Sequence, residues 1–303
     1  MTVSRICDTV IFLYRALSKV LAGADRPLRT LFHNCFLKRG LFKMEVKACI
    51  FTDAGKVRKV NQDSCLVKVA NTKRYGRISF AAVCDGMGGL SKGEVASCKM
   101  IRALEAWFHE ELSLMQNLPE DKLWDTIETS LSRLIVKSSS DIRRYGKHRG
   151  IKLGTTLTAF FQIGRRYMTL NIGDSRIYLV DRKRAWAVTR DQSVVQVKLD
   201  KGLISEDEAL KDPERSVLLQ SVGTTLEIKP VIRRGEIDSS TTVLAVSDGF
   251  WRTVSGDEMH SKLCPQMCVT ADDMLSGCRK LAGLAMDRKE EDNISVAAMC
   301  LEY

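Results

Sequence analysis

The sequence has no apolar run long enough to cross a membrane. A bilayer span needs about 18 consecutive apolar residues, and the nearest candidate, Ile6 to Leu21, is interrupted by Asp8, Arg15 and Lys19. No small-residue cleavage site accompanies this stretch, so we expect no signal peptide. Internal repeats and low-complexity tracts are also missing, which excludes the collagenous, fibrous and disordered classes.

The ten cysteines lack the paired spacing of a zinc site or a disulfide framework. Cys264 and Cys268 lie four residues apart, but no second Cys or His pair completes a tetrahedral set. Several others lie within apolar runs, so we expect reduced core thiols in a cytoplasmic protein. The four histidines are isolated from one another and are predicted to be structural or exposed rather than catalytic: His33, His109, His148 and His260.

Basic charge is concentrated at the N-terminus. The chain carries a net charge of +10, and residues 1–43 contribute +6 of it, with eight Lys or Arg against two Asp. The rest of the chain therefore has only a small basic surplus, unlike a nucleic-acid-binding domain. We predict no nucleic-acid partner.

Residues 1–43 allow three interpretations. Apolar residues at helical spacing predict a basic amphipathic helix that contacts a membrane surface or a partner. The interpretation we favour is that the segment packs on the body of the protein or is loosely ordered. In the third, translation begins at Met44, where the strongly patterned sequence starts. Any membrane contact would come through these residues alone.

From Met44 onward the hydrophobic pattern predicts one α+β domain, residues 44–303. Consecutive strands joined by tight turns pair antiparallel, and the regular strand–helix alternation of a parallel sheet is missing. A polar, helix-prone insertion covers 193–213. Strands are expected at 47–52, 64–70, 77–84, 154–162, 166–172, 175–180, 184–188, 216–222, 227–233, 242–247 and 294–301, and helices at 93–114, 120–144 and 272–287.

Acidic residues recur at the ends of predicted strands. Asp85 follows a buried strand and precedes glycines in VCDGMGG, and Asp248 ends another apolar run in the same way. Asp63, Asp174 and Asp292 also border strands. One such Asp usually starts a turn, and VCDGMGG alone fits a turn and a cation site equally well. Five carboxylates gathered together would repel one another unless cations lay between them, so the set favours a Mg²⁺ or Mn²⁺ site.

A pair of divalent cations can activate a water molecule for attack on phosphorus. Such chemistry also needs a cation that holds the phosphate oxygens. Arg58, five residues before Asp63, has the planar fork that matches phosphate geometry. Taken alone, however, Arg58 lies between Lys56 and Lys59 and is better explained as a solvated charge.

Eight motifs in order resemble the metal-dependent protein phosphatases, the protein phosphatase 2C or PPM-type family, in its bacterial branch. The resemblance covers about 47–302. It implies two stacked antiparallel β-sheets flanked by α-helices, an α-β-β-α sandwich with metal ions at one end. The motifs are TDAGKVRKVNQDS (52–64), VCDGMGGLSKGEVAS (83–97), LGTTLTAFF (153–161), NIGDSRIYLV (171–180), VTRDQSVVQ (188–196), DPERSVLLQSVG (212–223), AVSDGFW (245–251) and EDNISVAAM (291–299).

The resemblance also implies a role for each site residue. Asp85 would bridge two metal ions, and the Gly86 carbonyl would bind one of them. Asp248 and Asp292 would complete the protein ligands of the other metal. Asp63 would act mainly through a metal-bound water.

Three further roles follow from the same resemblance. Asp174, together with Asp248, would hold the third metal ion of bacterial members. Arg58 would bind the substrate phosphate. The insertion at 193–213 would be a mobile flap that tunes access to the cleft.

The implied function is hydrolysis of phosphoserine and phosphothreonine in proteins, by direct attack of a metal-bridging water. Mn²⁺ or Mg²⁺ would be the cofactor, with two or three ions per site. The expected partners are phosphorylated proteins and an opposing Ser/Thr kinase, and we expect a cytoplasmic monomer. Two alternatives stay open: an inactive phosphoprotein-binding member, and a dedicated regulator with a single phosphoserine partner.

Three residues depart from the pattern of many family members. Met87 stands where eukaryotic members carry a His proposed as general acid, so the leaving group would take its proton from water. Gln62 replaces a Glu, which removes one carboxylate. Gln192 replaces the His of an Asp-His-Ser string, with a consequence that the sequence does not reveal.

Overall fold

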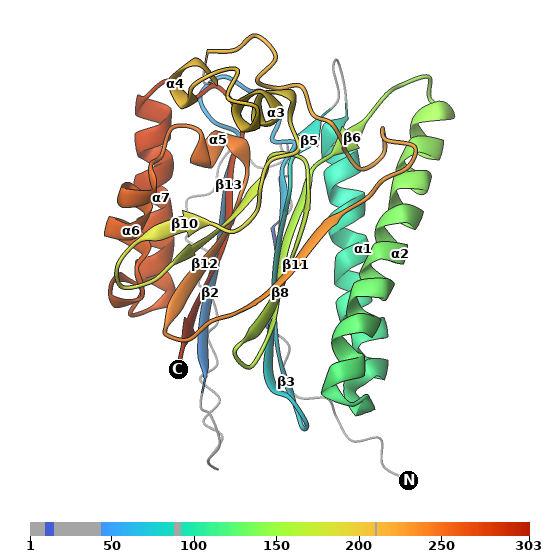
Figure 1. Cartoon of the computed structure of the whole chain (residues 1–303), viewed down its shortest axis with the longest axis vertical. Coiled ribbons are helices and arrows are strands. Elements are labelled where there is room, and N and C mark those ends of the chain that lie inside the picture. Colours follow the sequence, from blue (N-terminus) through green and yellow to red (C-terminus); the bar gives the residue numbers. More distant parts are fainter. Residues whose placement is uncertain (1–9, 15–43, 88–91, 210) are drawn as a thin grey trace, which may run out of the picture.

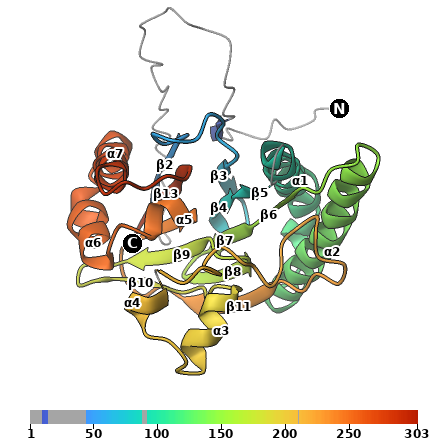
Figure 2. The same ribbon diagram turned by 90° about the horizontal axis from the view of Figure 1, so that it is seen from above.

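The computed structural model describes residues 10–14, 44–87, 92–209 and 211–303. Its strands form two antiparallel sheets stacked face to face, with helices on both outer faces (Figure 1). Figure 2, seen from above, shows α1 and α2 on one side of the sheets and α6 and α7 on the other. The predicted α+β sandwich of α-β-β-α layers is thus confirmed.

The first sheet has six strands in the order β1-β3-β4-β7-β8-β11. Two long antiparallel helices, α1 (Gly93–Leu114) and α2 (Glu120–Lys147), cover its outer face, and a short 3₁₀ turn, Met115–Asn117, joins them. The strands are β1 (Val10–Tyr14), β3 (Ser64–Thr72), β4 (Gly76–Cys84), β7 (Leu157–Ile163), β8 (Arg166–Ile172) and β11 (Val231–Glu236).

The second sheet has five strands in the order β10-β9-β12-β13-β2. Helices α6 (Gly256–Leu263) and α7 (Ala271–Asp287) cover its outer face, with a 3₁₀ turn, Pro265–Met267, between them. The strands are β2 (Glu45–Asp53), β9 (Arg176–Val180), β10 (Ala185–Ala187), β12 (Thr241–Val246) and β13 (Ile294–Glu302).

Both faces of each sheet are buried, so the central strands are apolar on successive residues rather than on alternate ones. In β4, Phe80 faces α1 and α2, whereas Ala81 faces the second sheet. Phe80 packs in a group of rings in which Trp107 and Trp124 both lie edge-on to Phe161, at centroid distances of 6.0 and 5.9 Å. Aromatic pairs of this geometry add stability beyond their buried area.

The cysteines of the described part are free thiols, and most of them are buried. Cys49 on β2 and Cys278 on α7 lie with their sulfur atoms 3.9 Å apart. The contact with Cys278, together with burial, raises the pKa of the Cys49 thiol well above its ordinary value. A thiol in such surroundings behaves as a small core residue.

Val10–Tyr14 is a strand, so the helix predicted within residues 1–43 is wrong at these five positions. They pair antiparallel with Cys65–Val69 and so cover the edge of β3. Without them, the backbone donors and acceptors on that edge of β3 would have no strand to pair with. The rest of the predicted helix lies outside the described residues. No helix among the described residues is long and apolar enough to cross a membrane.

Two predicted strands differ from the structure, and one helix of the structure was not predicted. The segment 216–222 is not a strand: Leu218 and Val222 each form a single bridge, and Val217 and Leu219 are exposed. The strand predicted at 227–233 starts later, at Val231. Helix α6 was not predicted, although its start carries a capping box of Ser255 and Glu258.

Candidate metal centre

The register of β3 and β4 places two of the aspartates together. Ser64 pairs with Cys84, so Asp63 and Asp85 lie one residue beyond the same pair at the end of the first sheet. Asp85 then enters a two-stranded ribbon of β5 (Gly86–Met87) and β6 (Gly154–Thr155).

The second sheet brings the other three aspartates to the same end. β12 finishes at Val246, which pairs with the first residue of β9 and the third residue of β13. Asp248 follows β12 and begins the short helix α5 (Asp248–Trp251). Asp174 precedes β9, and Asp292 precedes β13. Figure 1 shows α5, β5 and β6 at one end of the sandwich, where α3 (Val194–Asp200) and α4 (Glu206–Ala209) of the 193–213 insertion also lie.

The pKa values show that the five carboxyl groups lie within reach of one another's charge. Burial raises the pKa of Asp85 well above its ordinary value, and the charges of Asp63, Asp248, Asp174 and Asp292 raise it further. Burial raises the pKa of Asp63 to about 7, with smaller contributions from Asp248 and Asp292. Burial and the charge of Asp248 raise the pKa of Asp174 to about 8. We call these five residues the aspartate cluster.

Three buried oxygen atoms of the aspartate cluster lack a hydrogen-bond donor within the described residues. They are both carboxylate oxygens of Asp63 and Oδ1 of Asp248, in side chains of residues only 3% and 7% exposed. The Ser247 and Ser295 hydroxyls lower the Asp63 pKa in part, although neither reaches standard hydrogen-bond geometry. Buried acceptors without donors are costly. Oxygen atoms of this kind fit hard divalent cations, which accept carboxylate and carbonyl ligands.

Two arginines form ion pairs with members of the aspartate cluster. Arg58 Nη2 lies 2.9 Å from Asp292 Oδ2, and Arg252 forms an ion pair with Asp248 Oδ2. No group of three His, Cys, Asp or Glu side chains among the described residues is arranged to hold a metal ion. The Arg58–Asp292 pair is well exposed, at 54% and 30% of the two side chains. Exposed pairs are weak, so we expect this one to open when cations bind.

The backbone at Asp85 and Gly86 is fixed from both sides. The Asp85 N–H donates to Thr156 Oγ1 at 2.9 Å, and the Gly86 N–H donates to the Gln62 carbonyl at 3.2 Å. A Cβ at Gly86 would lie 2.4 Å from the Gly93 carbonyl oxygen, so only glycine fits. With its amide oriented to satisfy both neighbours, Gln62 donates to the Gly86 carbonyl at 3.1 Å and accepts from the Gly93 N–H at 3.1 Å.

Asn293 fixes the loop that carries Arg58, a role that the sequence did not reveal. Its side-chain nitrogen donates to the carbonyls of Ala54 (3.0 Å) and Val60 (3.2 Å), and its side-chain oxygen accepts from the Gln62 N–H (2.8 Å). These bonds tie both ends of the loop to the start of β13. The one available signal was the position of Asn293 directly after Asp292.

Asp174 is held by a second group of unpredicted residues. Trp251 Nε1 donates to the Asp174 carbonyl at 3.0 Å. The Arg176 guanidinium lies 3.3 Å from the centre of the Trp251 ring and binds both oxygens of Asp191, at 2.8 and 2.9 Å. This stacked, bidentate arrangement fixes the position of Trp251, and through it the turn at Asp174.

Gln192 clamps the turn before Asp174 onto the start of the 193–213 insertion. Its side-chain oxygen accepts from the Gly173 N–H, and its side-chain nitrogen donates to the Asn171 carbonyl, both at 3.2 Å. The Gln192 N–H donates to the Gly173 carbonyl at 2.8 Å. The substitution that the sequence left unexplained is therefore a buried structural contact.

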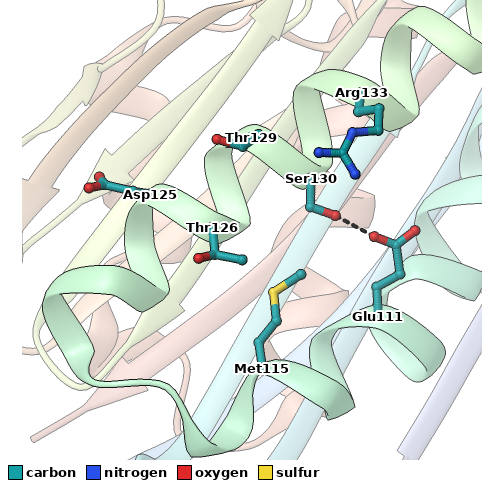
Figure 3. Close-up of a pocket in the computed structure, with 7 residues that line it drawn as sticks. All are labelled: Glu111, Met115, Asp125, Thr126, Thr129, Ser130 and Arg133. Carbon is teal, nitrogen blue, oxygen red and sulfur yellow. Dashed lines mark hydrogen bonds between the residues drawn. The ribbon is translucent and has the colours of Figure 1, made fainter.

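A hollow of about 320 Å³ lies between α1 and α2, away from the aspartate cluster (Figure 3). One of its lining groups, the Ser130 hydroxyl, accepts from Trp107 Nε1 at 2.8 Å and donates to the Glu111 carboxylate. None of the five aspartates lines it. The hollow is lined by Glu111, Met115, Asp125, Thr126, Thr129, Ser130 and Arg133.

The fold and the site together define a class: an α-β-β-α sandwich with a buried carboxylate cluster, suited to divalent cations, at one end of its sheets. The sequence profile of the family described as Protein phosphatase 2C matches residues 54–276. The chain belongs to this family.

Relatives in bacteria agree with this assignment. The chain is 29% identical over 248 residues to the serine/threonine phosphatase stp of Listeria monocytogenes serotype 4b, a match that covers 81% of this chain and 92% of that protein. It is also 29% identical over 246 residues to the serine/threonine protein phosphatase PstP of Mycobacterium tuberculosis, covering 81% of this chain and 43% of that longer protein.

Solved structures show the same architecture. The M. tuberculosis serine/threonine phosphatase PstP/Ppp superposes with a TM-score of 0.69 at 28% identity, covering 85% of this chain and 99% of that one. The PstP catalytic domain in complex with two manganese ions gives a TM-score of 0.68 at 26% identity, covering 86% and 100%. The chain therefore matches the bacterial branch of a metal-dependent phosphatase family.

Proposed function

We propose that this protein is a metal-dependent serine/threonine phosphatase that removes phosphate from phosphoserine and phosphothreonine in proteins. The observation that carries the proposal is the aspartate cluster, in which five carboxylates meet at the ends of strands. Three of their buried oxygens, both of Asp63 and Oδ1 of Asp248, lack a donor among the described residues. The named activity of the bacterial relatives supports it. By the resemblance to the family, each expected metal-ligand position carries an aspartate or, at Gly86, a backbone carbonyl.

The residues proposed to hold the cations are those of the aspartate cluster with one backbone carbonyl. Asp85 would bind both ions of a metal pair, and the Gly86 carbonyl would bind one of them. Asp248 and Asp292 would complete the protein ligands of the other ion. Asp63 would act mainly through a metal-bound water, and Asp174 would bind a third ion if one is present. The two manganese ions of the PstP complex favour Mn²⁺, although Mg²⁺ prefers the same oxygen ligands.

Divalent cations in this position lower the pKa of water and offset the negative charge of a phosphate ester. The protein's own contribution is positioning. Arg58, on the loop held by Asn293, presents an exposed guanidinium beside the aspartate cluster and can exchange Asp292 for the phosphate oxygens of a substrate. Met87 has no exchangeable proton, so the leaving serine or threonine oxygen takes its proton from water.

The proposed substrates are phosphorylated proteins, and an opposing Ser/Thr kinase would supply them. We propose that the protein works in the cytoplasm, where free thiols such as those of the described part stay reduced, and that it acts as a monomer. The 193–213 insertion is proposed to move as a flap. Its base is held by Gln192 and by the contact of Lys198 with Asp212 at 2.7 Å.

Metal removal tests the proposed function directly. Hydrolysis of p-nitrophenyl phosphate and of a phosphothreonine peptide should require added Mn²⁺ and should disappear in EDTA, because in the proposed mechanism the metal ions would activate the water that attacks phosphorus. Activity should return when Mn²⁺ is restored. Undiminished hydrolysis in EDTA would contradict the mechanism.

Replacing Arg58 by alanine should weaken substrate binding more than metal binding. We expect the KM for a phosphothreonine peptide to rise about tenfold or more, the effect of losing a charged hydrogen bond. The Mn²⁺ concentration for half-maximal activity should change by less than about threefold, since Arg58 only borders the ligands. Lys59→Ala, in the same exposed loop, is the matched control and should leave KM unchanged. A larger change in Mn²⁺ requirement than in KM would show that Arg58 serves the metal site.

A further inference from the structure

Arg252 lies inside the aspartate cluster rather than at its rim. It follows Asp248 by four residues, so the two side chains lie on the same face of the chain turn that begins with α5. Its side chain is only 18% exposed. It forms an ion pair with Asp248 Oδ2, and its Nη1 lies 3.9 Å from Oε1 of the buried Glu290.

The charge of Arg252 reaches several carboxylates of the cluster. Burial lowers the pKa of Arg252, but Asp248, Glu290, Asp174 and Asp292 together raise it by more, so the guanidinium stays charged. The ion pair with Asp248 and the approach to Glu290 place this positive charge at the side of the cluster that contains Asp248.

Asp248 consequently presents its two oxygens to different partners. Oδ2 is bound by Arg252, whereas Oδ1 is buried and has no donor within the described residues. A carboxylate presents two oxygens, and a guanidinium bound at one of them repels a cation that approaches from that side. With Oδ2 bound to a guanidinium, Asp248 has one oxygen left for a metal ion.

We propose that Arg252 is a positioning residue that occupies the place of a third cation, so that this protein holds two divalent metal ions and not three. Arg252 turns Oδ1 of Asp248 toward the metal pair and supplies the positive charge that Asp174 would otherwise take from a metal ion. This inference rests on the proposed function, because it assumes that the aspartate cluster binds metal.

The stoichiometry of bound Mn²⁺ tests the inference without reference to activity. In titrations to millimolar Mn²⁺, followed by the electron paramagnetic resonance signal of the free ion, the native chain should bind two ions. Arg252→Gln should bind three, because Asp248 Oδ2 and Asp174 become available. Arg252→Lys keeps the charge and should bind two. Arg279→Gln, an exposed arginine on α7, is the control and should also bind two.

Thermal unfolding in EDTA gives an independent readout. At pH 8 the Arg252→Gln protein should melt at least about 5 °C below the native chain, because a buried carboxylate loses its partner. Arg252→Lys should recover most of this loss. The Arg279→Gln control should melt with the native protein.

The outcomes separate this inference from the proposed function. A native chain that hydrolyses phosphopeptides and binds three Mn²⁺ ions overturns the inference and leaves the function standing. The same holds if Arg252→Gln still binds two ions. A native chain that binds no Mn²⁺ and has no phosphatase activity contradicts the proposed function, and the role of Arg252 with it.

Discussion

Asp85→Asn should reduce Mn²⁺-dependent hydrolysis of a phosphothreonine peptide by about a thousandfold or more. The change keeps the shape of the side chain but removes the charge nearest the centre of the aspartate cluster. Losing one well-placed electrostatic group commonly costs about 10²–10³ in rate, and a residue proposed to serve both cations should lie at the upper end of that range. Steady-state kinetics with saturating Mn²⁺ would measure the loss.

The same substitution should raise the stability of the metal-free protein. Burial and four neighbouring carboxylates raise the pKa of Asp85, which means that its charged form is unfavourable in the folded state. An amide removes this cost, so the melting temperature in EDTA at pH 8 should rise, while the stabilisation by added Mn²⁺ should shrink. Asp121→Asn, at an exposed aspartate of α2, is the control and should change neither quantity appreciably. Lower metal-free stability together with low activity would indicate simple misfolding instead.

Without metal ions, the protein should lose stability as the pH rises from about 4 to about 8. The folded pKa values of Asp63 and Asp174 are about 7 and about 8, far above the ordinary value of 3.8. Between these limits the unfolded chain has released the protons that the folded chain still binds, so the free energy of unfolding falls with pH. At about 1.4 kcal/mol for each unit of pKa shift, the total is on the order of several kcal/mol. The melting temperature in EDTA should be about 10 °C lower at pH 8 than at pH 5.

Saturating Mn²⁺ should remove or reverse this pH dependence. Metal ions bind the ionised carboxylates, so their stabilisation grows as protons leave the aspartate cluster. Melting curves from pH 5 to 8, with EDTA and with Mn²⁺, should therefore diverge most at high pH. Two parallel curves would mean that the cluster does not bind the metal, whereas a metal-free curve that stays flat from pH 5 to 8 would show that the carboxylates are already ionised at pH 5.

Local sequence signals predicted most of the regular elements. The apolar stripe of α1 predicted its bounds, 93–114, as they are in the structure, and the runs that became β8 and β12 were placed within a residue. Failures occurred where tertiary contacts override the local pattern. The mostly apolar segment 216–222 resembles a strand in sequence, but it pairs only at single residues with β6 and with the start of the 193–213 insertion.

The residues of the candidate site were also predictable only in part. The apolar runs that end in Asp predicted that Asp85 and Asp248 share one environment, because strand ends of antiparallel sheets meet at a common edge. The partners of these carboxylates were not predictable. Asn293 reaches back more than 230 residues to Ala54, and no local pattern distinguishes such an amide from an ordinary turn residue.

The hydrophobic pattern by itself determined the α+β class and the carboxylates at strand ends, because periodicity and strand-end position are local properties of the chain. The sandwich was implied by the resemblance of the motifs to a known family. Only the tertiary structure decided how those carboxylates are charged and oriented. Burial depth and the distances between groups from distant strands set the pKa values of Asp63 and Asp174. The same packing turned Arg252 inward onto Asp248, although by sequence alone it is one arginine among many.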